Sequence, residues 1–593
     1  MLLPLVLAAL AGTPPAISAP VSNLRYELTF TRQTAATRTL TVRTRLDVTG
    51  LGDVLLSLPS WTPGAYEVSN FARWVSEFGA KAGDKALRWD KLDYDTWRIR
   101  PEGAKALEVT FTYTADTLDN AMAWSRPDFL MVNGTNVFLY PEGRSLAFPA
   151  TVTVVTEPEW KIATGMAPAG AARSYGEKNF HDLVDMPFFI GAIDYDSAQV
   201  AGVTARLATY PAGTLGGQAR EAFWADYKKL FAPQAAAFAD TPYKTYTTMM
   251  LFEGSAGGSA LEHQNSHVGV YTPEGIGQEW VTSVTAHEMV HAYNVKRLRP
   301  AEMTPYRYDV AQPTPWLWVS EGITDYYADL VLVRAGIIDS AGFLETTGGK
   351  IENVANVPAV ALEDASLNTW IHPTDGTGYI YYPKGSLAGF LLDLMIRDAS
   401  DNRHSLDHVM AELYRTTYKA GRGFTGTDWW GAVSRAAGGK AFGFFERCCI
   451  DGREPFPYDS VLALGGLALV TDSMRVPRIG INAQSDSTGV VINQLAPGGA
   501  AEEAGLRPGD RLLEIGGISA GAQDVFDQFR AKYAGAAEGS PLPFKVERDG
   551  QVMTVSGTIK FATIRQQRLT FAGNPSAKAM RVRQGLLTGT TTR

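Results

Sequence analysis

Hydrophobic and polar residues alternate along the first third of the chain, with the two-residue period of half-buried β-strands. The runs 40–48 and 107–113 show this alternation most clearly. Turn sequences such as Pro63-Gly64 and Asn133-Gly134 separate the runs, and no long helical period interrupts them. We therefore expect residues 20–197 to form an N-terminal β-sandwich-like domain.

The pattern changes near residue 200, where hydrophobic residues recur with the 3.6-residue period of helices. One short apolar run, 247–252, has the length and composition of a strand. The helical periods cover the segments 218–239, 278–296, 320–336 and 384–398. Residues 198–456 are therefore expected to form a mixed α+β domain, so that the whole chain is multidomain α+β.

A third unit is expected at residues 462–562. Its segment 496–517 predicts a short helix that ends at Gly505, followed by a Pro508-Gly509-Asp510 turn into a strand. This arrangement closely resembles a C-terminal PDZ domain. The resemblance implies a peptide-binding groove whose carboxylate-binding loop contains Ile479, Gly480 and Ile481.

The last segment, 563–593, is basic, since no acidic residue occurs from Lys560 to Arg593. We expect either a solvated tail or a strand that packs back on the body of the protein. The whole chain carries a formal net charge of −8, which argues against a nucleic-acid partner. Its 45% hydrophobic and 20% charged residues are typical of a globular protein and exclude a mainly disordered or collagenous chain.

Residues 1–19 have the character of a secretory signal peptide. The run Leu2–Leu10 is apolar but too short to span a bilayer, and Ala16-Ile17-Ser18 fits the small-x-small cleavage rule. No later stretch approaches the roughly 18 continuous apolar residues of a membrane span. The sequence therefore predicts an exported protein, periplasmic or secreted, without a membrane span.

The only two cysteines, Cys448 and Cys449, are adjacent. A disulfide between neighbours closes an awkward eight-membered ring, so we expect two unpaired thiols, one buried and one exposed.

The central chemical signal is the HExxH sequence His287-Glu288-Met289-Val290-His291. Positions i and i+4 share a face of a helix, so both histidines can bind one metal ion. Glu288 follows the first histidine and can face a metal-bound water, as in zinc peptidases. The alternative is a pair of buried structural histidines.

A catalytic zinc needs three protein ligands and one open position. Two carboxylates compete for the third position: Glu302 in a Pro-rich loop, and Glu321 at the start of a predicted helix. Asp325 lies four residues after Glu321 and so on the same face, where a carboxylate can accept the second N–H of a ligand imidazole. We favour Glu321 as the ligand and Asp325 as this acceptor.

These motifs resemble the thermolysin-like, Glu-zincin superfamily of peptidases. Gly257–His263 is similar to the edge strand on which aminopeptidases of this superfamily bind the substrate's free α-amine, with Glu262 at the amine-binding position. Tyr382-Pro383-Lys384-Gly385 resembles their Tyr-x-Lys-Gly motif, whose tyrosine donates to the oxyanion. Tyr379 and Tyr381 remain competitors for that role.

Segments of the N-terminal domain narrow the resemblance. Leu58–Tyr66, Phe71–Arg73 and Leu183–Pro187 resemble the N-terminal domain of the PDZ-containing glycyl aminopeptidase family. The order of a β domain, a thermolysin-like zinc domain and a PDZ domain is the architecture of that family.

The resemblance implies a zinc metallo-aminopeptidase with one Zn²⁺ per chain that removes N-terminal Gly, and also Ala, from peptides with a free N-terminus. Glu288 would be the general base, with Glu262 and a free oxygen of Glu321 offsetting the substrate's ammonium charge. One alternative is a zinc endopeptidase whose PDZ domain recruits substrate C-termini. Another is a catalytically inert peptide-binding protein, against which the intact Glu288 argues.

Overall fold

The structure is a computed structural model that describes residues 16–486, 489–522 and 524–592 of the 593-residue chain. The apolar run at residues 2–10 lies outside the described residues. The chain divides into two compact units, one extending to Leu467 and resuming at Phe571, the other spanning Ala468–Thr570. The multidomain α+β prediction is confirmed.

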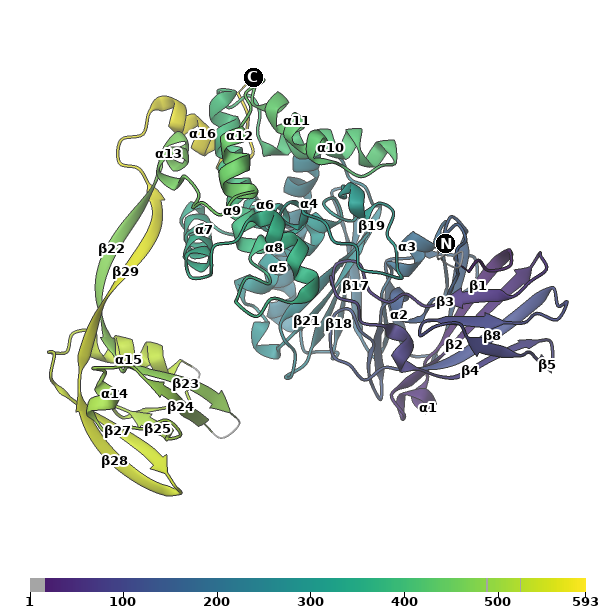
Figure 1. The fold of residues 1–593 in the computed structure, drawn as a ribbon, viewed down its shortest axis with the longest axis horizontal. Helices are drawn as coiled ribbons and strands as arrows, with labels where there is room; N and C mark the ends of the chain where they lie inside the picture. Colours follow the sequence, from purple (N-terminus) through teal and green to yellow (C-terminus); the bar gives the residue numbers. More distant parts are fainter. Residues whose placement is uncertain (1–15, 487–488, 523, 593) are drawn as a thin grey trace, which may run out of the picture. The chain divides into compact units, whose positions relative to one another are not determined.

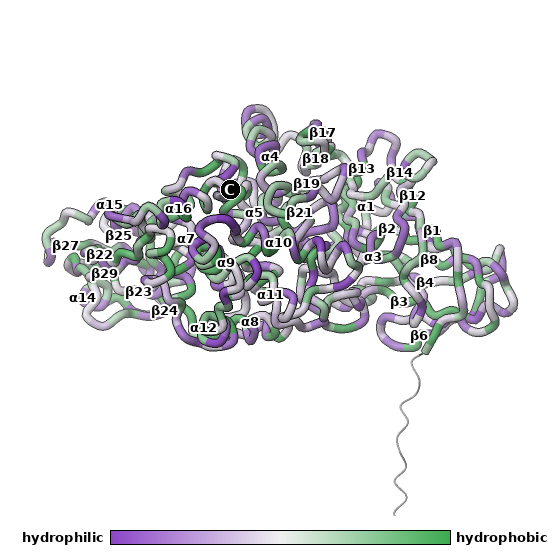
Figure 2. The backbone as a smooth tube through the Cα atoms, turned by 90° about the horizontal axis from the view of Figure 1, so that it is seen from above, coloured by the Kyte–Doolittle hydropathy of each residue, from purple (hydrophilic) through white to green (hydrophobic). Residues whose placement is uncertain are grey.

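The N-terminal part is built from strands that alternate buried and more exposed positions, as β2 (Thr39–Val48) does along its whole length. In its largest sheet, β1, β2, β8 and β4 lie side by side (Figure 1), and the hydropathy of the same backbone can be followed in Figure 2. That sheet has the order β14 (Ala167–Pro168), β15 (Ser174–Glu177), β12 (Ala150–Val155), β1 (Val21–Thr29), β2, β8 (Ala106–Thr114), β4 (Val75–Ala82) and β5 (Lys85–Ala86).

Two smaller sheets complete the N-terminal part. One has the order β13 (Lys161–Thr164), β16 (Phe188–Gly191), β10 (Phe129–Val132) and β9 (Trp124–Arg126). The other has the order β11 (Tyr140–Pro141), β3 (Val54–Ser57), β7 (Thr96–Ile99) and β6 (Trp89–Lys91). The N-terminal part is therefore rich in β structure, as predicted.

A mixed sheet begins the second part of this unit, with the order β17 (Asp194–Val200), β18 (Val203–Tyr210), β19 (Thr245–Phe252), β21 (Ser266–Tyr271) and β20 (Ser259–His263). Its apolar face shares one core with the N-terminal sheet of β13, β16, β10 and β9, through residues such as Phe129, Phe189, Met249 and Val268. This common core explains why the two parts form one compact unit. In the strand order of the mixed sheet, β20 is an edge strand.

Helices make up the rest of the second part, and α5, α6 and α9 group together in Figure 1. They include α4 (Gly217–Phe238), α5 (Glu279–His291), α6 (Ile323–Arg334), α7 (Ser340–Ala355), α8 (Leu362–Asn368), α9 (Tyr381–Ala399), α10 (Leu406–Thr416) and α11 (Gly426–Ala436), followed by the short helices α12 (Gly443–Phe445) and α13 (Tyr458–Leu462). Caps set several helix starts. For example, Asp339 accepts hydrogen bonds from the first-turn amides of α7, and Thr425 accepts one from Asp428 at the start of α11.

The structure ends α5 at His291, five residues earlier than the hydrophobic period predicts. The chain turns sharply there, and Val295 takes a positive φ of 105°, a conformation that a β-branched residue rarely adopts. Strain of this kind persists only where surrounding contacts hold it. After this turn, the amide of Lys296 donates to the carbonyl of His291 at 3.1 Å.

The second unit, Ala468–Thr570, is a small β-rich domain that contains the helices α14 (Ala500–Glu503) and α15 (Val525–Tyr533). Its main sheet has the order β23 (Ile481–Asp486), β24 (Gly489–Leu495), β25 (Arg511–Ile515), β27 (Pro541–Arg548) and β28 (Gln551–Thr558), with β26 (Ile518–Ser519) beside β25. The turn predicted at Pro508–Asp510 forms, and Asp510 accepts a hydrogen bond from the amide of Arg507 at 2.8 Å.

The chain enters and leaves this domain through paired strands, β22 (Leu467–Arg478) and β29 (Lys560–Phe571). Residues beyond them, assigned from the sequence to a basic tail, form α16 (Ala577–Thr588) in the first unit. Arg334 of α6 donates to the carbonyl of Leu586 at 3.3 Å, so α16 packs against the helical part. None of the helices in the described residues combines the length and the apolar character that crossing a bilayer requires.

The cysteine prediction is wrong. Cys448 and Cys449 are both buried and form a disulfide with each other. They lie in a π-helical turn, Glu446–Ile450. The bond joins adjacent residues and therefore links no distant parts of the fold.

Candidate active site

Helix α5 presents His287 and His291 on one face, as their spacing requires. Their Nε2 atoms lie 2.9 Å apart. His291 Nδ1 lies 2.8 Å from the carbonyl oxygen of Asn294, which can only accept, so Nδ1 carries the proton. This tautomer leaves His291 Nε2 free to bind a metal ion.

Glu321 reaches the two histidines from a π-helical turn, Trp318–Gly322, that precedes α6. Its Oε2 lies 3.0 Å from His291 Nε2 and 3.6 Å from His287 Nε2. This turn packs closely against α9, because a Cβ atom on Gly322 would lie 2.5 Å from the Cα atom of Gly385. The glycine of the Tyr-Pro-Lys-Gly sequence therefore allows α9 to approach Glu321.

The three atoms His287 Nε2, His291 Nε2 and Glu321 Oε2 fit a tetrahedral zinc ion. Zinc binds His nitrogen and carboxylate oxygen at about 2.0–2.2 Å, which places neighbouring tetrahedral ligands roughly 3.3 Å apart. The three separations of 2.9, 3.0 and 3.6 Å bracket that value. The competing candidate, Glu302, accepts a hydrogen bond from Thr314 at 3.1 Å and belongs to neither cluster of metal-binding groups in the described residues.

Asn294 connects the two elements that carry these ligands. Its side-chain amide donates to the carbonyl of Val319, in the turn of Glu321, at 2.7 Å, while its own carbonyl faces His291. The turn after α5 therefore fixes both the histidine tautomer and the position of the Glu321 turn.

Asp325 lies on α6 one turn after Glu321, with Oδ1 3.9 Å from His287 Nδ1. Its other oxygen lies 2.6 Å from the Nζ atom of Lys350, a residue of α7 that also contacts Asp329 at 2.6 Å. The separation from His287 is that of an ion pair and exceeds a hydrogen bond, so Asp325 acts on this imidazole mainly through its charge.

We expect Asp325→Asn to weaken metal binding about 10–100-fold without abolishing it, because the charge beside His287 is lost while all three ligands remain. Competition with a metal chelator would measure this. Asp329→Asn is the matched control, since it removes a carboxylate from the same lysine without facing His287. Equal affinities for wild type and Asp325→Asn would remove Asp325 from the metal site.

Glu288 is buried beside the ligands, and its Oε2 has no hydrogen-bond partner among the residues that the structure describes. Burial raises the pKa of Glu288 well above the ordinary glutamate value, and the carboxylates of Glu262 and Glu321 add to this against the opposing effect of His291. A carboxylate whose proton affinity is raised in this way suits a group that takes up and returns a proton.

Glu262 lies on the edge strand β20, and only 4% of its surface is exposed. Its carboxylate, that of Glu288 and His291 place one ligand atom each within 4.8 Å of one another. Burial raises the pKa of Glu262 to about 7, which Lys296 opposes. Lys296 Nζ lies 4.0 Å from Glu262 and 2.7 Å from Asp185 of the N-terminal part.

The three tyrosines near the start of α9 are placed differently. Tyr379 is 67% exposed, and the Tyr381 hydroxyl is buried 3.1 Å from that of Thr369. The ring of Tyr382 lies 5.9 Å from that of His287. Burial and the nearby Glu321 raise the pKa of Tyr382 well above its usual value, so its hydroxyl keeps its proton. Of the three, Tyr382 is the one that faces the histidines.

Ile479, Gly480 and Ile481 line a groove in the second unit together with Phe526, Phe529 and Arg530 of α15. Its volume is about 280 Å³. Gly480 has a φ of 81°, and a Cβ atom there would lie 2.8 Å from the Cα atom of Gly499, so the tight loop requires glycine. The predicted carboxylate-binding loop therefore lines a groove beside α15.

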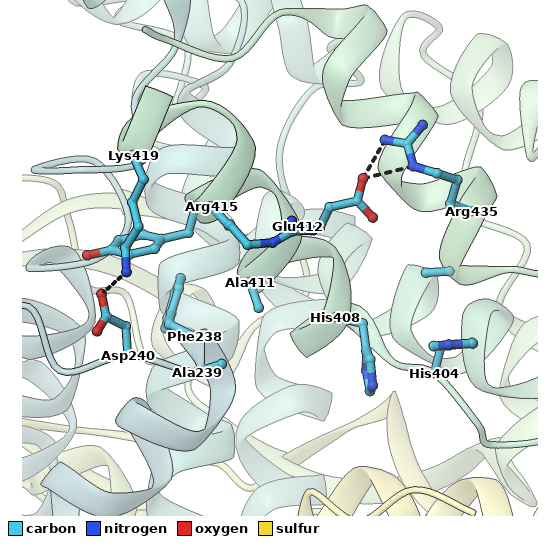
Figure 3. Close-up of a pocket in the computed structure, with 12 residues that line it drawn as sticks. Phe238, Ala239, Asp240, His404, His408, Ala411, Glu412, Arg415, Lys419 and Arg435 are labelled. Atoms are coloured by element: carbon cyan, nitrogen blue, oxygen red, sulfur yellow. Dashed lines mark hydrogen bonds and ion pairs between the residues drawn. The ribbon is translucent and has the colours of Figure 1, made fainter. Parts of the chain in front are cut away.

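Another pocket, of about 430 Å³, lies where α10 and α11 meet the end of α4 (Figure 3). Its charged side chains are largely paired with one another: Lys419 lies 2.9 Å from Asp240, and Arg435 lies 2.6 Å from Glu412. None of the predicted site residues lines it, so the candidate active site remains the cluster around α5.

Several residues that contact the site side chains could not be predicted from the sequence. Asn294, Lys296 and Lys350 lie outside the motifs, and only the folded chain brings them to the site. Tyr66 and Asp185 belong to segments that resemble the family, but no role could be read from them. The hydroxyl of Tyr66 donates to Glu321 Oε1, the oxygen that the sequence analysis left free for the substrate's ammonium.

Comparison with protein families gives three matches in chain order. Residues 25–192 match the Peptidase M61 N-terminal domain, residues 280–388 match M61 glycyl aminopeptidase, and residues 477–559 match a PDZ domain. The middle match contains His287, Glu288, His291, Glu321 and Tyr382.

Among known proteins, the chain is 31% identical over 102 residues to the zinc metalloprotease RasP of Geobacillus kaustophilus, covering 16% of this chain. The chain thus spans about a quarter (23%) of that relative.

Among solved structures, the chain is similar to an aminopeptidase N family protein from Idiomarina loihiensis, with a TM-score of 0.79 and 22% identity over 95% of this chain and 100% of that one. It also matches an M1 zinc metallopeptidase from Deinococcus radiodurans, with a TM-score of 0.49 and 17% identity over 75% of this chain and 96% of that one. The first of these supports the fold.

Proposed function

Because the chain belongs to the M61 glycyl aminopeptidase family, we propose that it is a zinc-dependent aminopeptidase that removes the N-terminal residue of peptides. The observation that carries this proposal is the convergence of His287 Nε2, His291 Nε2 and Glu321 Oε2 within 3.6 Å of one another. Zinc bound there would polarise the scissile carbonyl and lower the pKa of a water toward neutrality.

The neighbouring side chains supply the proton transfers and the charge stabilisation. Glu288 accepts a proton from the attacking water and delivers it to the leaving amine, because it is buried beside the ligands and lies outside the group of His287, His291 and Glu321. The Tyr382 hydroxyl, which keeps its proton, donates to the oxyanion.

Glu262 is proposed to bind the free α-amine of the substrate. A substrate with one residue before the scissile bond places its ammonium close to a metal dication, and carboxylates must offset that repulsion. Glu262 fits this role because it lies on the edge strand β20 and faces the cluster of Glu288 and His291. The carbonyl of Ala260 on the same strand already accepts a hydrogen bond from Asn120 at 2.7 Å, so the N-terminal part covers some of this edge.

The substrate preference, the ligand of the PDZ groove and the location of the protein are proposed from the family and the sequence. Preference for N-terminal Gly is supported by the family match. A peptide with a C-terminal carboxylate is the proposed ligand of the groove at Ile479, Gly480 and Ile481. Export to the periplasm or the exterior is supported by the apolar run at residues 2–10.

We expect Glu262→Gln to raise KM and lower kcat/KM for a glycyl dipeptide amide, while leaving the slow turnover of its N-acetylated twin unchanged. The reason is that only the free-amine substrate carries the charge that Glu262 offsets. The measurement is steady-state kinetics on the two substrates with the metal-loaded enzyme.

The two competing functions make different predictions for this pair of substrates. An endopeptidase would cleave the acetylated peptide at least as well as the free one, and Glu262→Gln would lower both rates equally. An inert binding protein would cleave neither. Either result would overturn the proposal.

A further inference from the structure

The segment Leu58–Tyr66 of the N-terminal part reaches into the active site and is held there at several points. The amide of Ser60 donates to the carbonyl of Tyr308 at 2.7 Å, and the indole of Trp61 donates to that of Arg307 at 2.7 Å. The Trp61 ring also packs edge-on against Trp370, with the centroids 5.1 Å apart. These contacts fix the segment on the catalytic part.

The end of this segment meets the amine-binding carboxylate directly. A Cβ atom on Gly64 would lie 2.5 Å from both carboxylate oxygens of Glu262, and Gly64 has a φ of 110°. Lys296, which pairs with Asp185, also donates to the carbonyl of Pro63 at 3.4 Å. The segment therefore approaches the site as closely as a backbone without a side chain permits.

Tyr66 follows two residues later and is 3% exposed. Its φ of 50° is uncommon for a residue with a side chain, and its ring packs edge-on against Trp370 at 6.1 Å. Its hydroxyl donates to Glu321 Oε1. The other oxygen of Glu321, Oε2, is the one that lies 3.0 and 3.6 Å from the two histidines.

We propose that Tyr66 is a positioning residue for the metal site: its hydroxyl holds Oε1 of Glu321 so that only Oε2 faces His287 and His291. This inference rests on the proposed function, because it takes Glu321 as a ligand. It makes the N-terminal β domain part of the metal centre.

Two physical arguments support this role. Glu321 is 1% exposed, so without Tyr66 its Oε1 would lose a hydrogen-bond donor in a place that water does not readily reach. Groups that orient a ligand carboxylate in this way typically contribute 10–100-fold in metal affinity. The strained backbone at Tyr66 persists because Trp61 and Ser60 hold the segment in place.

Tyr66→Phe keeps the ring and removes only the hydroxyl. We expect its zinc dissociation constant, measured by chelator competition, to rise about 10–100-fold, with unchanged secondary structure by circular dichroism. Tyr306→Phe is the matched control. Tyr306 is a buried neighbour of Trp61, and within the described part of the chain its hydroxyl has no hydrogen-bond partner. Its zinc affinity should equal that of the wild type.

The outcomes separate this inference from the proposed function. If Tyr66→Phe binds zinc as tightly as the wild type, Tyr66 does not position Glu321, although the aminopeptidase stands. If only KM for free-amine substrates rises, Tyr66 contacts the substrate and the inference is wrong. If Tyr306→Phe weakens zinc equally, the effect comes from the packing of the segment and the inference also fails. A wild-type chain without a zinc site would instead overturn the proposed function.

Discussion

Glu288→Gln is expected to lower kcat/KM by roughly 10²–10⁴-fold while leaving one zinc per chain and the fold intact. The amide keeps the size of the side chain but can no longer accept the proton of the attacking water. Glu288 is buried beside the ligands and contributes no atom to the set of His287, His291 and Glu321, so its replacement removes the base and not the metal. Steady-state kinetics and elemental analysis on the same preparation would measure both effects.

The zinc content decides how this result is interpreted. If Glu288→Gln lost its metal, Glu288 would be a ligand, and its assignment as the base would be wrong. If the variant kept both its metal and its activity, another group would carry the proton.

Glu321→Ala is expected to empty the metal site or to weaken its zinc affinity severely. The loss should exceed the roughly 10–100-fold loss of affinity that follows removal of a residue that only contacts a ligand. Two histidines alone cannot hold a catalytic zinc, which needs three protein ligands. Glu302→Ala is the matched control, because Glu302 is a glutamate of the following loop that contacts Thr314 and not the histidines. Its zinc stoichiometry should be that of the wild type.

Elemental analysis of the three proteins after dialysis would test this prediction. Equal zinc in wild type and Glu321→Ala would exclude the ligand set His287, His291 and Glu321. Loss of zinc in Glu302→Ala alone would identify Glu302 as the third zinc ligand.

The local part of the site could be predicted from the sequence because helical spacing determines it. Positions i and i+4 place His287 and His291 together on any helix, and Asp325 follows Glu321 by the same rule. The spacing could not give the length of α5, which ends where Val295 takes a positive φ. A hydrophobic period records which face is buried and does not record where a turn held by other contacts begins.

The other residues of the candidate site are brought together only by the tertiary structure. Tyr66 and Glu321 are 255 residues apart, and no period or motif relates positions at that distance. Asp185 of the N-terminal part contacts Lys296, which follows α5, in the same way. The resemblance marked both N-terminal segments, but only the folded chain shows what their side chains contact.

The fold, like the site, could be predicted only where local sequence patterns determine it. Alternation indicated the N-terminal strands, and the Pro508-Gly509-Asp510 turn indicated the PDZ domain. Helix α16 was missed, because a short basic segment carries little evidence of the surface on which it packs. The disulfide between Cys448 and Cys449 was missed because the eight-membered ring that it closes argued against pairing.

The most direct test of the central claim is mass spectrometry of the products formed from an unmodified peptide that begins with glycine, incubated with the zinc-loaded protein. An aminopeptidase is expected to give free glycine and a peptide shortened by one residue at its N-terminus as the first products, and to act far more slowly when the same peptide is N-acetylated. Internal fragments from either peptide, or no cleavage of the free peptide, would contradict the account.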